Sequence, residues 1–308
     1  MTERTPLLAI CIPTYNRCDI LKECLEDTIS KVRRYNIPII VSDNASTDDT
    51  EQVVRDFIKD YPELIYFRQN ENIEADHNFE TVLKLSPGNY SWLLGDAYRI
   101  VEEELSSILD ILRTGKHCAV INNSFSRIKD IPSKIYTHPD PLLYDIGWHM
   151  TIICSLILSK DLVHNTNFAR YYNTNFIQDG IIFEYWTTHP QATVYWYDKS
   201  CNTATSQTRQ SWYNQRWIIF GLHWTSYILS LPSTISLETK LKCINQHNQK
   251  SRLFTFKRTI LLRMDDHFNL DILKQCKAYQ KYFWDIPYIV PYLIAVLPKW
   301  FLRIFCIV

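Results

Sequence analysis

Asp96 is well placed in this sequence to bind a cation. It follows the apolar run 92–94 and Gly95, and it precedes Ala97 and Tyr98. Such a run is typical of a buried parallel strand, which presents the residue at its carboxyl end to a cleft. A carboxylate in that place is a suitable ligand for Mg²⁺ or Mn²⁺. Sites that hold such a cation commonly carry two or three acids, whereas this segment has one.

Two loops upstream also carry polar residues at the ends of predicted strands. The apolar run 7–13 leads into a segment that could frame a diphosphate: Pro13, Thr14, Tyr15, Asn16 and Arg17. This segment would face the N-terminus of the next helix, where anions are favoured. Asp43 and Asn44 follow the run 37–41, and the Asp43 carboxylate could accept a hydrogen bond from a pyrimidine imide or a ribose hydroxyl. For both loops the alternative is ordinary helix capping.

The elements that must position these residues follow a simple pattern. Short apolar runs alternate with stretches of helical periodicity over the first 125 residues. The predicted strands are 7–13, 37–41, 64–67, 90–94 and 118–121, and the predicted helices are 20–29, a segment from Asp48, 75–85 and 102–112. Asp48 and Glu51 have the spacing of a capping box. The alternation indicates right-handed βαβ units and a parallel sheet covered by helices on both faces.

Four motifs, in this order, resemble family-2 glycosyltransferases of the GT-A fold. They are residues 11–17 (CIPTYNR), 41–48 (VSDNASTD), 72–78 and 92–96 (WLLGD), and the resemblance covers about residues 6–125. It is strongest to the abequosyltransferase-like branch of bacterial O-antigen and capsule enzymes. The resemblance implies a Rossmann-like, mostly parallel sheet flanked by helices, with a helical C-terminal extension. It also implies transfer of a sugar from a nucleoside-diphosphate donor to a glycan carried on a polyprenyl diphosphate.

The resemblance also implies roles for single residues. Pro13, Thr14, Tyr15, Asn16 and Arg17 would frame the nucleotide, together with Asp43, Asn44, Asn78, Gly95 and Asp96. Asp96 would touch the ribose or a metal ion, Mn²⁺ or Mg²⁺. The family commonly has three consecutive acids after the glycine, and the last one is usually the metal ligand. Ala97 and Tyr98 occupy the second and third places here, so the motif keeps the first acid and lacks the usual metal ligand.

Two substitutes for the missing acids remain open. A histidine from the second half of the chain could be a ligand: His149, His189 or His223. Alternatively, Arg99 or Arg209 could neutralise the leaving diphosphate without a metal.

Asp179 is the candidate for the catalytic base, which an inverting transfer needs to deprotonate the acceptor hydroxyl. Relatives in the family carry an acid at a helix start 80–100 residues after the metal motif, and Asp179 lies 179 − 96 = 83 residues after Asp96. The alternative is that Asp179 only caps the helix-like run 181–186. Glu184, one turn later, is the second candidate.

Three segments with different tasks are expected. Residues 1–125 would bind the nucleotide sugar, residues 126–215 would complete the same domain with acceptor and catalytic groups, and residues 216–308 would form a helical region with a membrane-associating tail. Residues 286–308 are almost wholly apolar, but three prolines interrupt them: Pro287, Pro291 and Pro298. Attachment to a membrane surface is therefore favoured over a spanning helix. Packing of this segment on the protein's own core is the alternative.

The amino-acid composition bears on the class of protein and on its compartment. Lys+Arg and Asp+Glu are equal at 33 each, so no overall field favours nucleic acid. Nine cysteines without a CxxC pair, and no recognisable signal peptide, are typical of a cytoplasmic protein. We therefore expect a peripheral enzyme at the cytoplasmic face of the inner membrane. A nucleotidyltransferase and a catalytically silent binding or scaffold subunit of the same fold are the alternatives.

Overall fold

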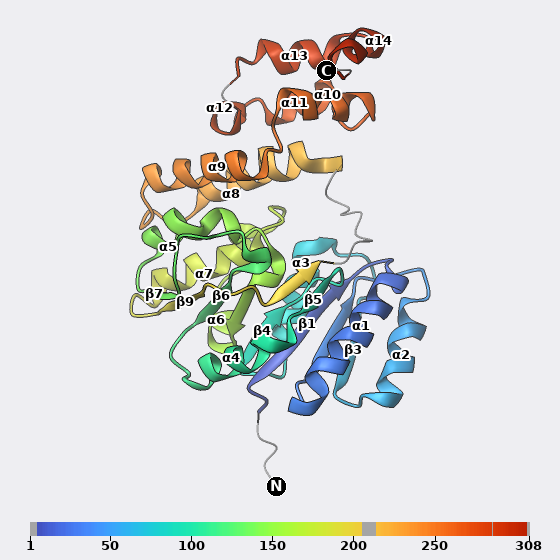
Figure 1. Cartoon of the computed structure of the whole chain (residues 1–308), viewed down its shortest axis with the longest axis vertical. Coiled ribbons are helices and arrows are strands. Elements are labelled where there is room, and N and C mark those ends of the chain that lie inside the picture. The colour runs from blue at the N-terminus through green and yellow to red at the C-terminus, as the bar shows by residue number, and fades with distance from the viewer. Residues whose placement is uncertain (1–4, 205–213, 285, 307–308) are drawn as a thin grey trace. The chain divides into compact units, whose positions relative to one another are not determined.

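The computed structural model describes residues 5–204, 214–284 and 286–306 (Figure 1). It divides into two compact units. The first comprises Met1–Tyr172 and Phe176–Thr208, and the second comprises Asn173–Asn175 and Arg209–Val308.

The first unit is built on a mixed, mostly parallel sheet of eight strands in the order β3-β2-β1-β4-β8-β6-β9-β7. The strands are β1 (Leu8–Thr14), β2 (Ile39–Asp43), β3 (Leu64–Arg68), β4 (Tyr90–Leu93), β6 (Ala119–Asn122), β7 (Lys134–Tyr136), β8 (Leu156–Ser159) and β9 (Val194–Tyr197). β8 runs antiparallel between β4 and β6, and β7 runs antiparallel to β9. A separate two-stranded ladder joins β5 (Tyr98–Ile100) to β10 (Asn202–Ala204). The continuous apolar runs form these central strands because both faces of the sheet are covered.

Helices cover both faces of this sheet. They are α1 (Cys18–Val32), α2 (Thr50–Asp60), α3 (Glu74–Lys84), α4 (Glu102–Arg113), α5 (Pro139–Ile146), α6 (Lys160–Asn165) and α7 (Ile177–Thr188). One apolar core contains the buried side chains of α1, α2 and α4, and α1 and α2 lie side by side in Figure 1. α3 packs on β1 and β2, and it contacts α6 and α7. Short 3₁₀ turns occur at Arg33–Tyr35, Ser124–Ser126, Gly147–His149, Ile153–Ser155 and Ala169–Tyr171.

The second unit is helical. It contains a π-helical segment (Trp217–His223), α8 (Trp224–Ser230), α9 (Leu237–Ser251), α10 (Phe256–Met264), α11 (Leu270–Cys276), α12 (Gln280–Phe283), α13 (Ile289–Val296), α14 (Lys299–Leu302) and a final 3₁₀ turn (Arg303–Cys306). Its core is an aromatic cluster in which Trp217 meets four other rings: Phe254, Phe268, Phe283 and Trp284. Among the described residues, no helix is both long enough and apolar enough to cross a bilayer.

The predicted fold class is confirmed: five predicted strands and four predicted helices form, with ends shifted by a few residues. The prediction of a capping box was wrong in detail. α2 begins at Thr50, whose backbone N–H and hydroxyl both donate to Asp48, while Glu51 pairs with Arg55 instead. The functional division into residues 1–125, 126–215 and 216–308 remains a prediction, because the two compact units carry no assigned task.

Candidate functional site

The strand register brings three predicted site residues to one edge of the sheet. Thr14 at the end of β1 stands opposite Asp43 at the end of β2, and Asp43 stands opposite Arg68 at the end of β3. On the other side of β1, the N–H of Leu94 donates to the carbonyl of Cys11, so the chain leaves β4 towards Asp96 at the same edge. This is the edge at which parallel α/β sheets bind ligands.

Asp96 is held by the loop that follows β1. The Thr14 hydroxyl donates to Asp96 Oδ2 at 3.0 Å, and Arg17 Nη1 lies 3.2 Å from Asp96 Oδ1. The side chain is buried, with 4% exposed. Burial raises the pKa of the Asp96 carboxyl, and the nearby Arg17 and Thr14 oppose that rise. Predicted nucleotide-binding residues from two segments, 79 or more positions apart in the chain (96 − 17 = 79), therefore meet directly.

Arg99 holds the same turn by hydrogen bonds to its backbone. Its Nη1 donates to the backbone carbonyls of Asp96 and Tyr98, and its Nη2 donates to Glu23. The side chain is nearly buried, so these contacts fix the backbone around Asp96. Arg99 therefore positions Asp96 rather than presenting a free charge at this edge of the sheet.

Asn16 connects the first loop to the second. Its backbone has φ 49°, a left-handed conformation that asparagine tolerates better than most residues. Its N–H donates to the Ser46 hydroxyl at 2.8 Å, and its side-chain oxygen accepts from the N–H of Thr47 at 2.7 Å. The predicted donor-site residue Asn16 thus sets the distance between the loops after β1 and β2.

Asp43 is fully buried at the end of β2. Its Oδ1 accepts from the N–H of Ser46 at 2.9 Å, and its Oδ2 accepts from the Tyr66 hydroxyl at 2.7 Å, with Arg68 Nε 3.7 Å away. A carboxylate has about four acceptor positions, so lone pairs remain for a ligand. Tyr66 and Arg68 were missed by the sequence analysis, although their place at the end of the third predicted strand was the available signal.

The other predicted nucleotide-binding residues differ in what they contact. Asn78 uses its amide group on β2: Oδ1 accepts from the Ser42 hydroxyl, and Nδ2 donates to the Ser42 carbonyl. Asn44 binds the loop before α3 through Asn72 and the N–H of Ile73. Both residues therefore hold loops in place, and a nucleotide contact for either one stays a prediction.

Pro13, Tyr15 and Gly95 complete the predicted set. Pro13 is buried within β1, whereas the Tyr15 ring is exposed at the edge. A Cβ added at Gly95 would lie 3.0 Å from the Tyr98 ring, so glycine allows the close turn between β4 and β5. Their contacts with a nucleotide also stay predictions.

Asp179 lies apart from this hydrogen-bonded group, with which it shares no hydrogen bond or ion pair. It is the third residue of α7 and is 1% exposed, and neither of its carboxylate oxygens has a hydrogen-bond partner among the residues that the structure describes. Burial raises the pKa of Asp179 well above its usual value. A Cβ at the adjacent Gly180 would lie 2.4 Å from the Tyr171 ring, so this ring packs directly against Gly180. An unpartnered buried carboxyl is costly, and such perturbed groups are concentrated at functional sites.

Glu184, the alternative base, and the three histidines proposed as metal ligands make other contacts. Glu184 accepts from the Tyr171 hydroxyl at 2.8 Å and pairs with Arg170. Burial lowers the pKa of His149 to about 3, and its Nε2 lies 3.0 Å from the carbonyl oxygen of Asn122. His189 stacks on Tyr185, and His223 bonds Asn175. Arg209 lies outside the described residues.

The residues present do not fit a cation held by a cluster of acids. Within the described residues, no group of three or more His, Cys, Asp or Glu side chains is close enough to bind a metal ion. Asp96 already faces a guanidinium, and Ala97 and Tyr98 offer no carboxylate. Asp96 as a metal ligand stays a prediction, and we derive no step that depends on a metal.

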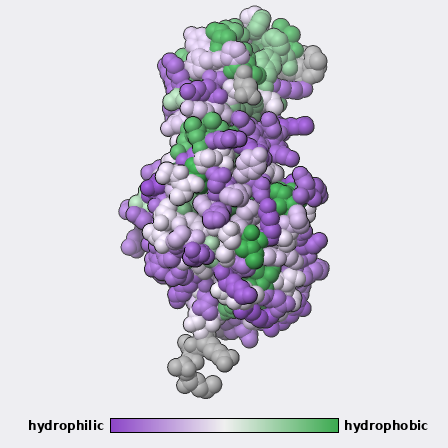
Figure 2. Space-filling view, turned by 90° about the vertical axis from the view of Figure 1, so that its left-hand side faces the viewer, coloured by the Kyte–Doolittle hydropathy of each residue, from purple (hydrophilic) through white to green (hydrophobic). Residues whose placement is uncertain are grey.

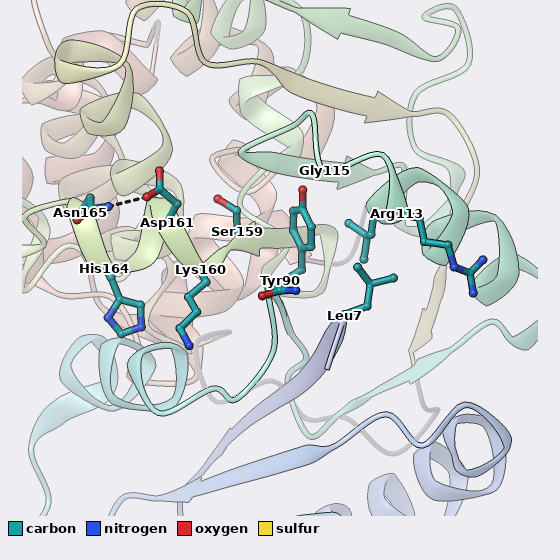
Figure 3. A pocket seen from close by; sticks show the side chains of 11 residues that line it. Leu7, Tyr90, Arg113, Gly115, Ser159, Lys160, Asp161, His164 and Asn165 are labelled. Carbon is teal, nitrogen blue, oxygen red and sulfur yellow. Dashed lines mark hydrogen bonds between the residues drawn. The ribbon is translucent and has the colours of Figure 1, made fainter. Parts of the chain in front are cut away.

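A separate cavity of about 600 Å³ lies at the other end of the strands (Figure 3). Leu7, directly before β1, and Tyr90, the first residue of β4, line it with Ser159, Lys160 and Asp161. Figure 3 shows Asp161 hydrogen-bonded to Asn165. Because none of the predicted site residues lines this cavity, the candidate functional site is the edge formed by Thr14, Asp43 and Asp96.

Comparison with known proteins agrees with this fold. The model of the family described as Glycosyl transferase family 2 matches residues 9–178, which is more than half of the chain. The chain belongs to glycosyl transferase family 2.

The relatives are bacterial. The chain is 32% identical over 194 residues to the abequosyltransferase RfbV of Salmonella typhimurium, which covers 55% of this chain and 58% of that protein. It is 27% identical over 164 residues to the UDP-Glc:alpha-D-GlcNAc-diphosphoundecaprenol beta-1,3-glucosyltransferase WfaP of Escherichia coli, covering 53% of this chain and 64% of that protein. The matches thus span less than two thirds of these relatives.

Solved structures share the fold over most of the chain. TarS residues 1–349 of S. aureus, in complex with UDP-GlcNAc, has a TM-score of 0.56 at 12% identity, covering 93% of this chain and 90% of that one. The mannosyltransferase PcManGT of Pyrobaculum calidifontis, in complex with GDP-Man and Mn²⁺, has a TM-score of 0.54 at 14% identity, covering 96% and 87%. At these identities the likeness establishes the fold alone.

Proposed function

We propose that this protein is a glycosyltransferase that uses a nucleoside-diphosphate sugar as donor. The supporting observation is the group of contacts in which Thr14 and Arg17 hold the buried Asp96 at the carboxyl edge of the sheet. The donor lies along this edge, with its base and ribose near Asp43 and its diphosphate near Arg17. Membership of the family and the donors bound by TarS and PcManGT support this placement.

Transfer proceeds by a single displacement at the anomeric carbon. The acceptor hydroxyl oxygen forms the new bond, the bond from the anomeric carbon to the diphosphate oxygen breaks, and the diphosphate leaves with the electron pair. Asp179 takes the proton of the hydroxyl. Its raised pKa makes the ionised form a stronger base than an ordinary aspartate. Displacement from the opposite side inverts the anomeric configuration.

The acceptor is a glycan on a polyprenyl diphosphate, used for a bacterial surface polysaccharide such as O-antigen or capsule. The relative WfaP acts on a diphosphoundecaprenol acceptor, and a Campylobacter jejuni relative, 30% identical over 111 residues and covering 36% of each chain, is a GalNAc(5)-diNAcBac-PP-undecaprenol glucosyltransferase. An acceptor of this kind remains anchored in the inner membrane, so its enzyme must work at the cytoplasmic membrane surface.

The second unit offers a surface for that membrane. On α13 the side chains of Ile289, Tyr292, Leu293 and Val296 are exposed at spacings of three and four residues, so they form one stripe. The opposite side of α13 packs on α10 and α11. The stripe continues in four further exposed side chains, and together the eight residues form the C-terminal apolar surface: Ile289, Tyr292, Leu293, Val296, Trp300, Phe301, Ile304 and Phe305.

The chemistry of this surface fits an anionic lipid bilayer. Figure 2 shows hydrophobic residues gathered on the C-terminal helices, at the top of the view. Trp300 is 70% exposed. Residues 286–308 contain no acid and two basic residues, of which Lys299 pairs with Asp266 at 2.6 Å and Arg303 is the second. Interfacial aromatic and aliphatic side chains next to basic residues are typical of proteins that lie on anionic membranes.

Release of a nucleoside diphosphate is the direct test of the proposed function. The purified protein is incubated with UDP-, GDP-, dTDP- and CDP-sugars, with and without an undecaprenyl-diphosphate-linked glycan. We expect one donor to be consumed, and Asp179→Asn to lower the rate about 10²–10⁴-fold without changing donor affinity.

Two outcomes would contradict parts of this proposal. Binding of a nucleotide sugar without any turnover would favour a silent binding subunit, which the reduced acid motif makes the main alternative. Full activity of Asp179→Asn would exclude Asp179 as the base while leaving the transferase assignment intact.

A further inference from the structure

The acid motif of this chain has lost the residues that would hold a divalent cation. Asp96 is followed by Ala97 and by Tyr98, whose ring packs near Phe125 with centroids 5.8 Å apart. Burial raises the pKa of the Tyr98 hydroxyl above its usual value. The hydroxyl therefore stays protonated and offers no anionic oxygen. Asp96 is the one carboxylate that this segment can contribute.

That carboxylate is already occupied by a cation and a hydroxyl. Arg17 lies against Oδ1 and Thr14 donates to Oδ2. A divalent ion at Asp96 would lie next to the guanidinium charge, and the two like charges would repel each other in a largely buried site. The site therefore opposes the cation that a cluster of acids would attract.

The other described residues do not restore the missing ligands. The described residues contain no group of three potential metal ligands. Residues 205–213, which lie outside the described ranges, read TSQTRQSWY and include no Asp, Glu, His or Cys. That segment cannot supply the acid or imidazole that the motif lacks.

Arg17 has an unused hydrogen-bond donor. Its Nη1 faces Asp96, whereas its Nη2 is buried and makes no hydrogen bond to any described residue. A buried guanidinium N–H without a partner is unfavourable, and a phosphate oxygen is the strongest partner available to it. Arg17 also directly precedes α1, a helix of 15 residues. The first N–H of α1, that of Cys18, donates to Asp48, and the following N–H groups favour an anion.

From these contacts we infer that Arg17 neutralises the leaving diphosphate in place of a divalent cation, so that donor binding and transfer require no metal. Asp96 keeps the guanidinium in position through Nη1, and Nη2 donates to a phosphate oxygen. As the anomeric carbon–oxygen bond breaks, the electron pair stays on the diphosphate, and Arg17 stabilises that charge. This inference rests on the proposed function, because it concerns the same donor site.

Nucleotide binding in the presence and absence of metal tests the inference without an activity assay. UDP, GDP, dTDP and CDP are titrated calorimetrically into the wild-type protein with EDTA and then with Mn²⁺. We expect one nucleotide to bind with a Kd that differs by less than about twofold between the two conditions. Arg17→Gln should weaken that binding at least tenfold, and Arg17→Lys should restore part of it, because lysine keeps the charge without the guanidinium geometry.

Arg34→Gln is the matched control. Arg34 lies on the first unit, is largely exposed, pairs with Glu102 and belongs to no part of the donor site. It should bind nucleotide like the wild type. The affinity of Arg17→Gln for the corresponding nucleoside should change less than its affinity for the diphosphate, since the lost contact is to phosphate.

The outcomes separate the two proposals. Binding that EDTA abolishes and Mn²⁺ restores would overturn the metal-free site and leave the proposed transferase standing. Equal affinity of the wild type and Arg17→Gln for the diphosphate would overturn the role of Arg17. Failure of all four nucleotides to bind under both conditions would overturn the inference together with the proposed function.

Discussion

At the scale of single residues, Asp179 combines two demands that conflict. A base must ionise, yet burial without a hydrogen-bond partner favours the protonated form. In the folded protein the Asp179 carboxyl therefore keeps a proton that the same group releases in the unfolded chain above a pH of about 4. A ligand that brings a hydroxyl to this carboxyl would supply the missing partner.

The pH dependence of stability follows from this conflict. Because the pKa of Asp179 is raised in the fold, the folded state binds more protons than the unfolded state above pH 4. The free energy of unfolding of the wild type therefore falls as pH rises from about 4 towards the folded-state pKa. Asp179→Asn lacks this loss, so we expect its melting temperature to exceed that of the wild type by a margin that grows between pH 4 and pH 8.

Calorimetric melts across this pH range provide the measurement. Asp110→Asn is the control, because Asp110 is 68% exposed and pairs with Arg113 at the surface. A difference between Asp179→Asn and the wild type that stays constant with pH would show that Asp179 ionises normally in the fold.

Part of the candidate site could be predicted from the sequence, because the geometry of a parallel sheet determines where strand ends lie. Thr14, Asp43 and Asp96 follow apolar runs, and parallel strands bring their carboxyl ends together whatever the loops contain. Arg17 and Asp96 are 79 residues apart in the chain, and their contact depends on the direction in which each side chain points. The periodicity of apolar residues does not encode that direction. The same holds for Tyr66, which reaches Asp43 from the neighbouring strand.

At the scale of elements, length decided which strands could be recognised. β1 and β2 have seven and five residues, all of them buried, and each contains a continuous apolar run. β5 has three residues and lies directly after the turn at Asp96, and its partner β10 is about 100 residues away. Such a short strand carries no period of its own, so pairing alone defines it.

The C-terminal apolar surface is the element that we expect to meet the membrane. Replacement of Trp300 and Leu293 by serine removes two large exposed apolar side chains, each worth about 1.5–3 kcal/mol when fully buried. We expect the double variant to bind vesicles of phosphatidylglycerol at least tenfold more weakly than the wild type in a flotation assay. The wild type should bind phosphatidylcholine vesicles more weakly than phosphatidylglycerol vesicles, because basic residues are attracted to anionic headgroups.

A matched control keeps this test specific. Leu237 and Ile135 are exposed by 63% and 52% and lie on other elements, so Leu237→Ser with Ile135→Ser should leave flotation unchanged. A wild type that stays in the buffer would contradict the membrane role. Self-association that the Trp300 and Leu293 changes abolish would assign the surface to a second copy of the chain.

At the scale of the whole molecule, the chain consists of a sheet-based unit and a helical unit. The change from alternating strands to helices near residue 216 was visible in the sequence, because apolar runs give way to helical periodicity. The position of β8 was not visible. It is a four-residue strand, and nothing in its sequence specifies that it inserts antiparallel between β4 and β6.

That insertion predicts how the first unit tolerates truncation. β6 pairs with β8 and β9 but not with β4, so a fragment of residues 1–125 contains β6 without a neighbouring strand. We expect this fragment to exchange its β6 amides rapidly, whereas residues 1–204 should protect them, as hydrogen exchange can measure. Protection of β6 in the shorter fragment would contradict the observed strand order.

The cysteines of the chain have a practical consequence. Among the eight whose side chains the structure describes, seven are buried, and Cys18 alone is partly accessible. It is the first residue of α1 and directly follows Arg17. With Cys306 replaced by serine, a maleimide dye would attach at one point beside the donor loop. The natural sequence thus already carries a fluorescence reporter position for nucleotide arrival.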